Sequence, residues 1–129
     1  MEENKKAFKC KHFSQMTREE RITLMRLKDK VLEHDIEFTE HALKAMSNRR
    51  VKEWEIVKAI KSGQIIEYRE TQKDKRITIR STFKNRKDFV VYVSLSLVDN
   101  IVITTYYDSY YNIHKERDFT KYDETLKIL

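Results

Sequence analysis

The chain has 129 residues, of which 40% are hydrophobic and 37% are charged, and its formal net charge is +6. This length suits one domain with one core. A single cysteine, Cys10, excludes an intrachain disulfide and a zinc site built from several cysteines. One glycine and no proline argue against a sandwich of many tight turns, which would need more of both.

The positive charge comes from 27 Lys and Arg against 21 Asp and Glu. Such a surplus favours a nucleic acid, an anionic membrane or an acidic protein as partner, although a merely solubilising surface explains it equally well. No apolar run approaches the roughly 20 residues of a membrane helix. The first residues also lack the apolar segment of a signal peptide. We therefore expect a cytoplasmic protein with no membrane partner.

The chain divides into three parts by composition. Residues 1–16 are polar and basic, and we expect a flexible arm there. Residues 17–111 carry the periodic apolar patterns and are expected to form a single α+β domain. Residues 112–129 are polar and charged, which predicts a tail or a short helix.

Two helices are expected in the first half of the domain. Thr17, followed three residues later by a glutamate, has the pattern of a capping box and predicts an amphipathic helix over 17–32. The apolar stripe of this helix could dock on the domain itself or on a second copy in a homodimer. Thr39 is the expected N-cap of the next helix, which should fray near residues 47–48.

A third helix is expected over 52–62. Trp54, Val57 and Ile60, with Ile56, supply its apolar face. Gly63, the only glycine, stands where a left-handed residue commonly ends a helix. The sequence therefore predicts the end of this helix at Gly63.

After Gly63 the apolar residues alternate, which is the period of β-strands. Asp99 and Asn100 suit a tight hairpin turn. Strands are expected over 64–71, 76–83, 88–98 and 101–107. Together the elements predict an α+β fold, with N-terminal helices packed on one face of an antiparallel sheet of about four strands.

The strand expected over 76–83 has one apolar and one polar face. Ile77 and Ile79 share the apolar face, which the helices should cover, whereas Arg76 and Arg80 lie on the other face. This uncovered face should therefore be basic. Cations that extend it into a predicted phosphate-binding surface are Lys73, Lys75, Arg86 and Lys87. An ordinary solvated face is the alternative.

Four short motifs stand out in this part of the chain. They are Phe38-Thr39-Glu40-His41-Ala42, Asn48-Arg49-Arg50-Val51, Gly63-Gln64-Ile65-Ile66-Glu67 and Ile101-Val102-Ile103-Thr104-Thr105-Tyr106-Tyr107. Over about residues 36–108, these motifs resemble a widespread bacterial and phage domain family of unknown function. That family is similar to the RNA-cleaving toxins of the BrnT and RelE type. The resemblance implies a RelE/BrnT-like fold, metal-independent RNA cleavage without a cofactor, and a protein antitoxin as partner.

RNA cleavage without a metal needs a base for the 2′-hydroxyl proton, cations for the phosphate and an acid for the leaving oxygen. His41 matches the histidine of the family motif and is the candidate base or acid, although it could instead hold the following loop. Arg50 matches the family's arginine and could clamp a phosphate, or else pair with Glu53. Arg80 and Tyr107 complete the expected catalytic set.

A further set of residues is expected to bind nucleic acid. Its members are Arg49, Arg76, Lys75, Arg86, Lys87 and Tyr106. Tyrosines beside a basic sheet can stack on bases, although packing within the sheet explains them equally well. The four histidines are too scattered to predict a metal site.

Two functions from different classes follow. The first is an RNA-targeting, toxin-like endoribonuclease, which requires His41, Arg50 and Arg80 to converge on one cleft. The second is a non-catalytic phage or bacterial regulator that binds a protein or a nucleic acid. The expected helix over 17–32 and the long tail favour the second because a minimal toxin does not need them, while the segments outside the resemblance, 1–35 and 109–129, leave open a toxin, an inactive descendant or a regulator.

Overall fold

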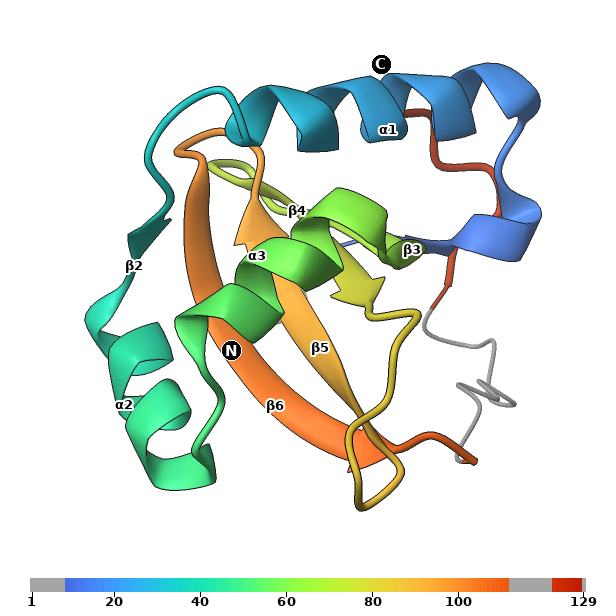
Figure 1. The fold of residues 1–129 in the computed structure, drawn as a ribbon. Coiled ribbons are helices and arrows are strands. Elements are labelled where there is room, and N and C mark those ends of the chain that lie inside the picture. Colours follow the sequence, from blue (N-terminus) through green and yellow to red (C-terminus); the bar gives the residue numbers. More distant parts are fainter. Residues whose placement is uncertain (1–8, 112–121, 129) are drawn as a thin grey trace, which may run out of the picture.

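The structure is a computed structural model that describes residues 9–111 and 122–128 (Figure 1). The helices are the 3-10 helix η2 (Phe13–Gln15) and the α-helices α1 (Arg18–Val31), α2 (Glu40–Arg49) and α3 (Glu53–Ser62). The strands are β1 (Lys9–His12), β2 (Glu37–Phe38), β3 (Gln64–Glu70), β4 (Lys75–Arg80), β5 (Phe89–Ser96) and β6 (Ile101–Ser109).

The six strands form one mixed sheet in the order β1-β3-β4-β5-β6-β2. Strands β3 to β6 are antiparallel neighbours in chain order, and β1 pairs antiparallel with β3. Strand β2 pairs parallel with β6. The expected RelE/BrnT-like fold, with N-terminal helices on an antiparallel sheet of about four strands, is therefore wrong. Strands β1 and β2, of 4 and 2 residues, are too short to show an alternating apolar pattern.

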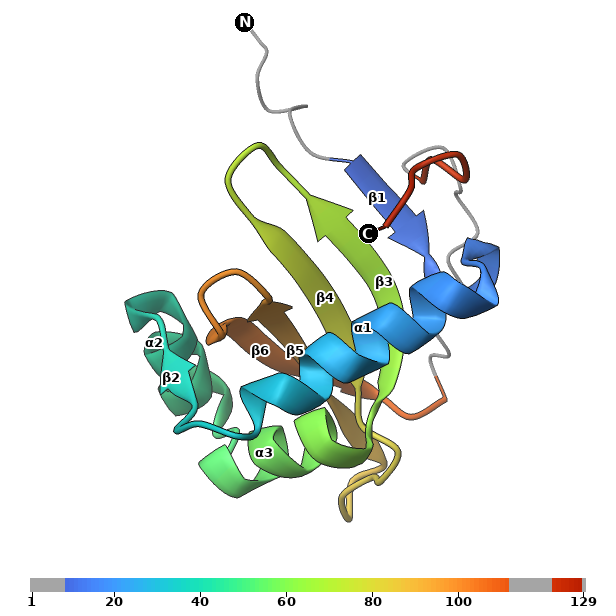
Figure 2. The same ribbon diagram turned by 90° about the horizontal axis from the view of Figure 1, so that it is seen from above.

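The described α-helices α1 and α3 pack on one face of the sheet, and a second, smaller buried cluster of Ile66, Val90 and Tyr92 lies apart from this core. Figure 2 shows α1 and α3 crossing the same face. Leu24 of α1 and Ile56 of α3 are fully buried there against Ile77 and Val93 of the sheet. Burying one such side chain contributes about 1.5–3 kcal/mol. The helix layer therefore docks on its own sheet.

Helix α1 begins at the predicted capping box. The Thr17 hydroxyl accepts the backbone N–H of Glu20, and the Glu20 carboxylate accepts the backbone N–H of Thr17. The same carboxylate accepts Lys11 Nζ at 2.8 Å and the backbone N–H of Ile128 at 3.0 Å. Near the other end of α1, Lys28 Nζ donates to the carbonyl oxygen of Ile60 in α3. These bonds connect α1 with both chain ends and with α3.

Residues from both ends of the chain extend the sheet. Lys9–His12, which the sequence analysis places in a flexible arm, pair with β3. Tyr122 forms a parallel bridge with Cys10, and Leu126 packs into the core. The remainder of the expected arm and most of the expected tail lie outside the described residues. In the ranges that the structure covers, no helix is long and apolar enough to cross a membrane.

Gly63 ends α3, as predicted, but not in the left-handed conformation. Its φ of −76° and ψ of 173° are those of extended backbone. A Cβ at this position would press on the carbonyl oxygen of Ala59 and would lie 2.6 Å from Ile79 Cγ2. Glycine is therefore needed for a close approach of the chain to β4. The left-handed residue follows α2 instead, at Arg50, where φ is 57°.

Candidate functional site

A cleft of about 570 Å³ opens between the junction of α2 and α3, the loop from β4 to β5, and β6. Its lining residues are Arg49, Arg50, Lys52, Trp54, Glu55, Asn85, Arg86, Lys87, Phe89 and Tyr107. The set contains five cations and one carboxylate. Because these residues come from three separate parts of the chain, the cleft exists only in the folded protein.

Tyr107 and Glu55 form a hydrogen-bonded pair in this lining. The Tyr107 hydroxyl donates to Glu55 Oε1 at 2.7 Å, and the same oxygen accepts the backbone N–H of Lys52 at 2.9 Å, as part of the cap of α3. Burial and the hydrogen bond to Glu55 raise the pKa of Tyr107 to about 12. The phenol therefore keeps its proton at neutral pH and is not a base there. Glu55 is occupied in holding the start of α3.

Arg49 and Arg50 lie at the end of α2 and differ in how they are held. Arg49 Nη1 donates to the carbonyl oxygen of Thr105 in β6 at 2.9 Å. Arg50 takes the left-handed conformation that turns the chain toward α3, and its side chain is exposed. Both side chains are exposed, and that of Arg49 is held at the sheet by its bond to Thr105.

The loop between β4 and β5 contributes Arg86 and Lys87 to the same cleft that Arg49 and Arg50 line from the end of α2. The side-chain oxygen of Asn85 accepts the backbone N–H groups of Lys87 and Phe89, at 2.9 and 3.0 Å. These bonds fix the backbone of the loop, while the side chains of Arg86 and Lys87 are exposed. The Phe89 ring stacks on Tyr107 with a centroid distance of 6.2 Å.

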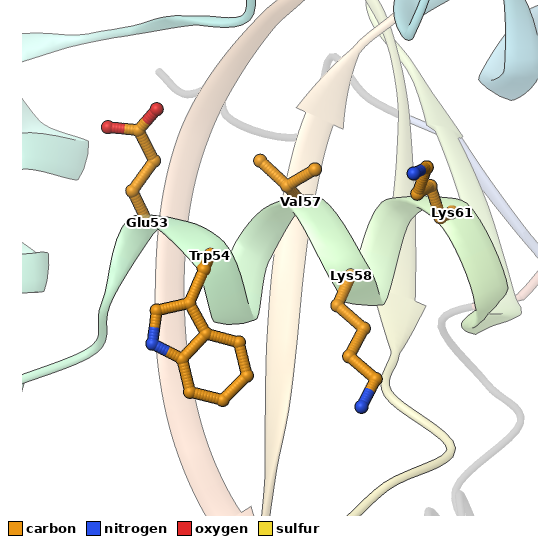
Figure 3. Close-up of a pocket in the computed structure, with 5 residues that line it drawn as sticks. All are labelled: Glu53, Trp54, Val57, Lys58 and Lys61. Carbon is orange, nitrogen blue, oxygen red and sulfur yellow. The ribbon is translucent and has the colours of Figure 1, made fainter.

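Trp54 adds a large exposed ring to the rim of the cleft. Its side chain is 61% exposed, and it stacks on Phe83 at 6.3 Å with an interplanar angle of 22°. Trp54 and Lys58 extend from the same side of α3 (Figure 3), and Lys58 Nζ lies 4.6 Å from the centre of the Phe83 ring. The indole also lines a groove along α3, so the aromatic surface continues beyond the cleft.

The sequence analysis missed Trp54 because it placed the indole on the buried face of α3. The buried residues of that helix are Glu55, Ile56, Ala59 and Ile60. Trp54 lies two positions before Ile56, which is about 200° away around the helix axis. This spacing from Ile56 indicates that the Trp54 ring lies on the exposed side of α3.

The cleft brings together half of the predicted site. Its predicted members are Arg49, Arg50, Arg86, Lys87 and Tyr107. His41 is exposed in the first turn of α2 and is not among the lining residues. It precedes Arg50 by the length of the helix, about 13 Å along the axis.

The predicted residues Arg76, Arg80 and Tyr106 lie on the face without helices. Arg76 and Tyr106 line a polar hollow of about 240 Å³, where Arg76 Nε donates to Asp74 at 2.6 Å. Lys75 is exposed at the start of β4. Arg80 lies at the end of the same strand, and its guanidinium donates to the hydroxyl of Tyr92 and to the carbonyl oxygen of Tyr110.

The three residues expected to converge for catalysis are therefore apart. Arg76 and Arg80 alternate along β4 with Ile77 and Ile79, which pack under the helices. Arg80 thus lies on the face opposite the helices, whereas His41 lies on α2 and Arg50 ends it. Among the cavities lined by described residues, none contains His41, Arg50 and Arg80 together.

The cleft falls within a segment that matches a known family. The family model described as a domain of unknown function, DUF4258, matches residues 38–107. The chain belongs to the DUF4258 family. Membership of a domain family of unknown function, expected over about residues 36–108, is thus confirmed. Comparisons with curated proteins and with solved structures find no match.

Every residue that lines the cleft lies inside the DUF4258 segment. The elements β1 and α1 and the residues from 122 to 128 lie outside it. The candidate site is therefore a property of the DUF4258 domain, and the added elements complete the sheet and core around it.

Proposed function

We propose that the cleft binds single-stranded RNA. The observation that supports this proposal is the combination of five cationic side chains with two exposed rings, Trp54 and Phe89, around one hollow. Cations attract the phosphates of a nucleic acid, and aromatic faces stack on its bases. The one carboxylate of the lining, Glu55, accepts bonds from within the protein, so it opposes a phosphate less than a free carboxylate would.

A single strand fits these features better than a duplex. Bases inside a helix are stacked on each other, so only unpaired bases offer their faces to protein rings. Trp54 also lines the groove along α3, together with the cations Lys58 and Lys61 and with Glu53, and its ring stacks on Phe83. A strand that leaves the cleft along α3 would thus meet further groups of the same kinds.

Endoribonuclease activity by attack of the 2′-hydroxyl is the second candidate. It is favoured by Arg50 and Tyr107, two of its expected residues, in the same cleft. In such a reaction Arg50 would stabilise the phosphate and Tyr107 would donate a proton, since its raised pKa keeps it protonated. Among the described residues of the cleft, no histidine is present to act as the base. For this reason we favour RNA binding over RNA cleavage. This second candidate includes the proposed resemblance to BrnT and RelE toxins and a protein antitoxin as the proposed partner.

The binding proposal is tested by fluorescence anisotropy with a short labelled single-stranded RNA. The test variant is Arg86→Gln with Lys87→Gln, and the control is Arg26→Gln with Lys30→Gln, which removes the same charge from exposed positions of α1. Each lost phosphate contact should reduce the slope of log affinity against log salt by about 0.7. We expect a shallower slope for the cleft variant alone. Absence of binding, or an equal loss in both variants, would overturn the proposal.

The second candidate has a separate measurement. The purified chain is incubated with RNA and a chelator, and the RNA ends are analysed for cyclic phosphates. Cyclic phosphates that disappear with Arg50→Ala would establish cleavage in this cleft. RNA that stays intact beside demonstrably bound protein would eliminate it and leave binding alone.

A further inference from the structure

A second cavity, of about 340 Å³, lies where β3 begins. Strand β1 pairs only with residues 67–70 of β3, so the first three residues of β3 continue beyond the end of β1. The 3-10 helix η2 and the first turn of α1 contribute the other wall of the cavity. It shares no lining residue with the cleft.

Arg21 of α1 lines this cavity and is incompletely bonded. Its guanidinium lies 4.7 Å from the centre of the Phe13 ring. Its Nε is buried and has no hydrogen-bond partner among the residues that the structure describes. A buried N–H without an acceptor is unfavourable, so native proteins almost always provide one. Arg21 therefore carries a hydrogen-bond donor that none of the described residues uses.

Arg80 brings a second guanidinium to the same cavity. It is held by its bonds to the hydroxyl of Tyr92 at 3.1 Å and to the carbonyl oxygen of Tyr110 at 2.8 Å. No acidic side chain occurs among the described residues of the lining. Two cations without a local carboxylate attract an anion, and guanidinium groups match the oxygens of a phosphate or a carboxylate.

The remaining lining combines three polar residues, His12, Ser14 and Gln64, with three apolar ones. Phe13, Ile65 and Ile66 face the cavity from η2 and from the start of β3. Sites for small molecules typically combine such apolar walls with a few polar groups and enclose about 300–1,000 Å³. The cavity therefore suits a molecule with an apolar or ring-shaped body that carries one anionic group.

We infer that this cavity binds a small organic anion, in which a phosphate or carboxylate lies between Arg21 and Arg80 and the organic body lies on Phe13 and the two isoleucines. Arg21 and Phe13 come from outside the DUF4258 segment, whereas Arg80 comes from inside it. The site is thus created by the added N-terminal elements. It does not depend on the RNA proposal, because the lining residues differ.

The test uses isothermal titration calorimetry of the full chain with phenyl phosphate, benzoate and inorganic phosphate as probes. Phenyl phosphate and benzoate distinguish the two anionic groups, and inorganic phosphate measures the contribution of the organic body. We expect at least one of the two aromatic probes to bind more tightly than inorganic phosphate. Arg21→Gln should weaken that binding about ten-fold or more.

Arg26→Gln is the matched control, since it removes the same charge from an exposed position of α1. It should change affinity by less than about two-fold. Methyl NMR of the unaltered protein gives a readout that needs no variant: probe addition should shift the methyl signals of Ile65 and Ile66. The inference is overturned if neither aromatic probe binds, if shifts occur only elsewhere, or if both variants lose affinity equally.

RNA binding by Arg21→Gln separates this inference from the proposed function. The variant should bind single-stranded RNA as the unaltered chain does, because Arg21 lies outside the cleft. Loss of the small anion with unchanged RNA binding supports both proposals, and loss of RNA binding would overturn the independence of the two sites.

Discussion

The candidate cleft and the buried ion pair between Lys11 and Glu20 use the same kinds of side chain in opposite ways. Lys11 and Glu20 are 4% and 8% exposed, and Lys11 Nζ donates both to Glu20 and to the carbonyl oxygen of Leu126. The side chains of Arg50 and Arg86 are exposed at the cleft. The comparison teaches that burial and pairing, rather than residue type, separate charges that hold the fold from charges that are available to a ligand.

Glu20→Gln is expected to have the largest effect, since it removes one partner of the buried pair. Losing one member of such a pair leaves an uncompensated charge and destabilises by about 3–5 kcal/mol. Urea denaturation should show this loss, whereas Glu19→Gln, an exposed neighbour in the same turn, should stay within about 0.5 kcal/mol. Equal stability of the two variants would contradict the structural role of the pair.

The same pair predicts a dependence of stability on pH. Burial of Glu20 opposes its ionisation, but the hydrogen bonds from Lys11 and from the backbone of Thr17 and Ile128 outweigh it and lower its pKa below 4.5. A carboxyl with a lower pKa in the folded state stabilises fully above its unfolded pKa, and this stabilisation is lost as the pH falls through the folded pKa. Denaturation series below pH 4.5 should therefore show a steeper loss for the unaltered chain than for Glu20→Gln.

At the cleft, Trp54→Ala should weaken RNA binding with little change in the free energy of unfolding. Base stacking on an aromatic ring contributes about 1–3 kcal/mol, which corresponds to roughly 5- to 150-fold in affinity. Leu43→Ala is the control, because Leu43 is also exposed, at 53%, but lies on α2 outside the cleft. Anisotropy titrations of both variants provide the comparison, and an unchanged affinity of Trp54→Ala would remove the ring from the binding surface.

A smaller effect is expected for Tyr107→Phe. This change removes the hydroxyl that donates to Glu55, and such a bond contributes about 0.5–1.5 kcal/mol to stability. RNA affinity should stay within about two-fold, because the hydroxyl is already bonded inside the protein. A large drop in affinity at unchanged stability would show instead that the phenol contacts RNA.

His41→Ala should have the smallest effect. The side chain is exposed on α2 and does not line the cleft, so stability should change by less than about 0.5 kcal/mol. RNA binding should be unaltered. If expression of the chain arrests bacterial growth and His41→Ala relieves that arrest, the catalytic role expected from the sequence motif would be restored.

Local patterns were sufficient to predict much of the secondary structure. The cap at Thr17 and the N-cap at Thr39 are formed as expected, because each depends on residues within one turn. Alternation along β4 correctly separated Ile77 and Ile79 from the arginines. Strand β2 was missed because its two residues become a strand only through pairing with β6.

The sequence analysis named several of the residues that line the cleft, but it did not predict that they meet there. Arg50, Arg86 and Tyr107 were each expected to contact RNA, yet the sequence does not show that the loop of β4 and β5 approaches the end of α2. Their meeting depends on tertiary packing over long separations. Arg80 was grouped with His41, although the alternation of β4 already placed it on the side away from the helices.

The position of β1 has a consequence for any shortened version of this protein. Strand β1 covers the outer backbone of β3 at residues 67–70, and it lies outside the DUF4258 segment. A fragment of residues 38–107 alone would leave that backbone with unpaired N–H and C=O groups. Open edges of this kind recruit strands from other molecules. Such a fragment would also lack α1, which covers part of the core, and we expect it to self-associate or precipitate.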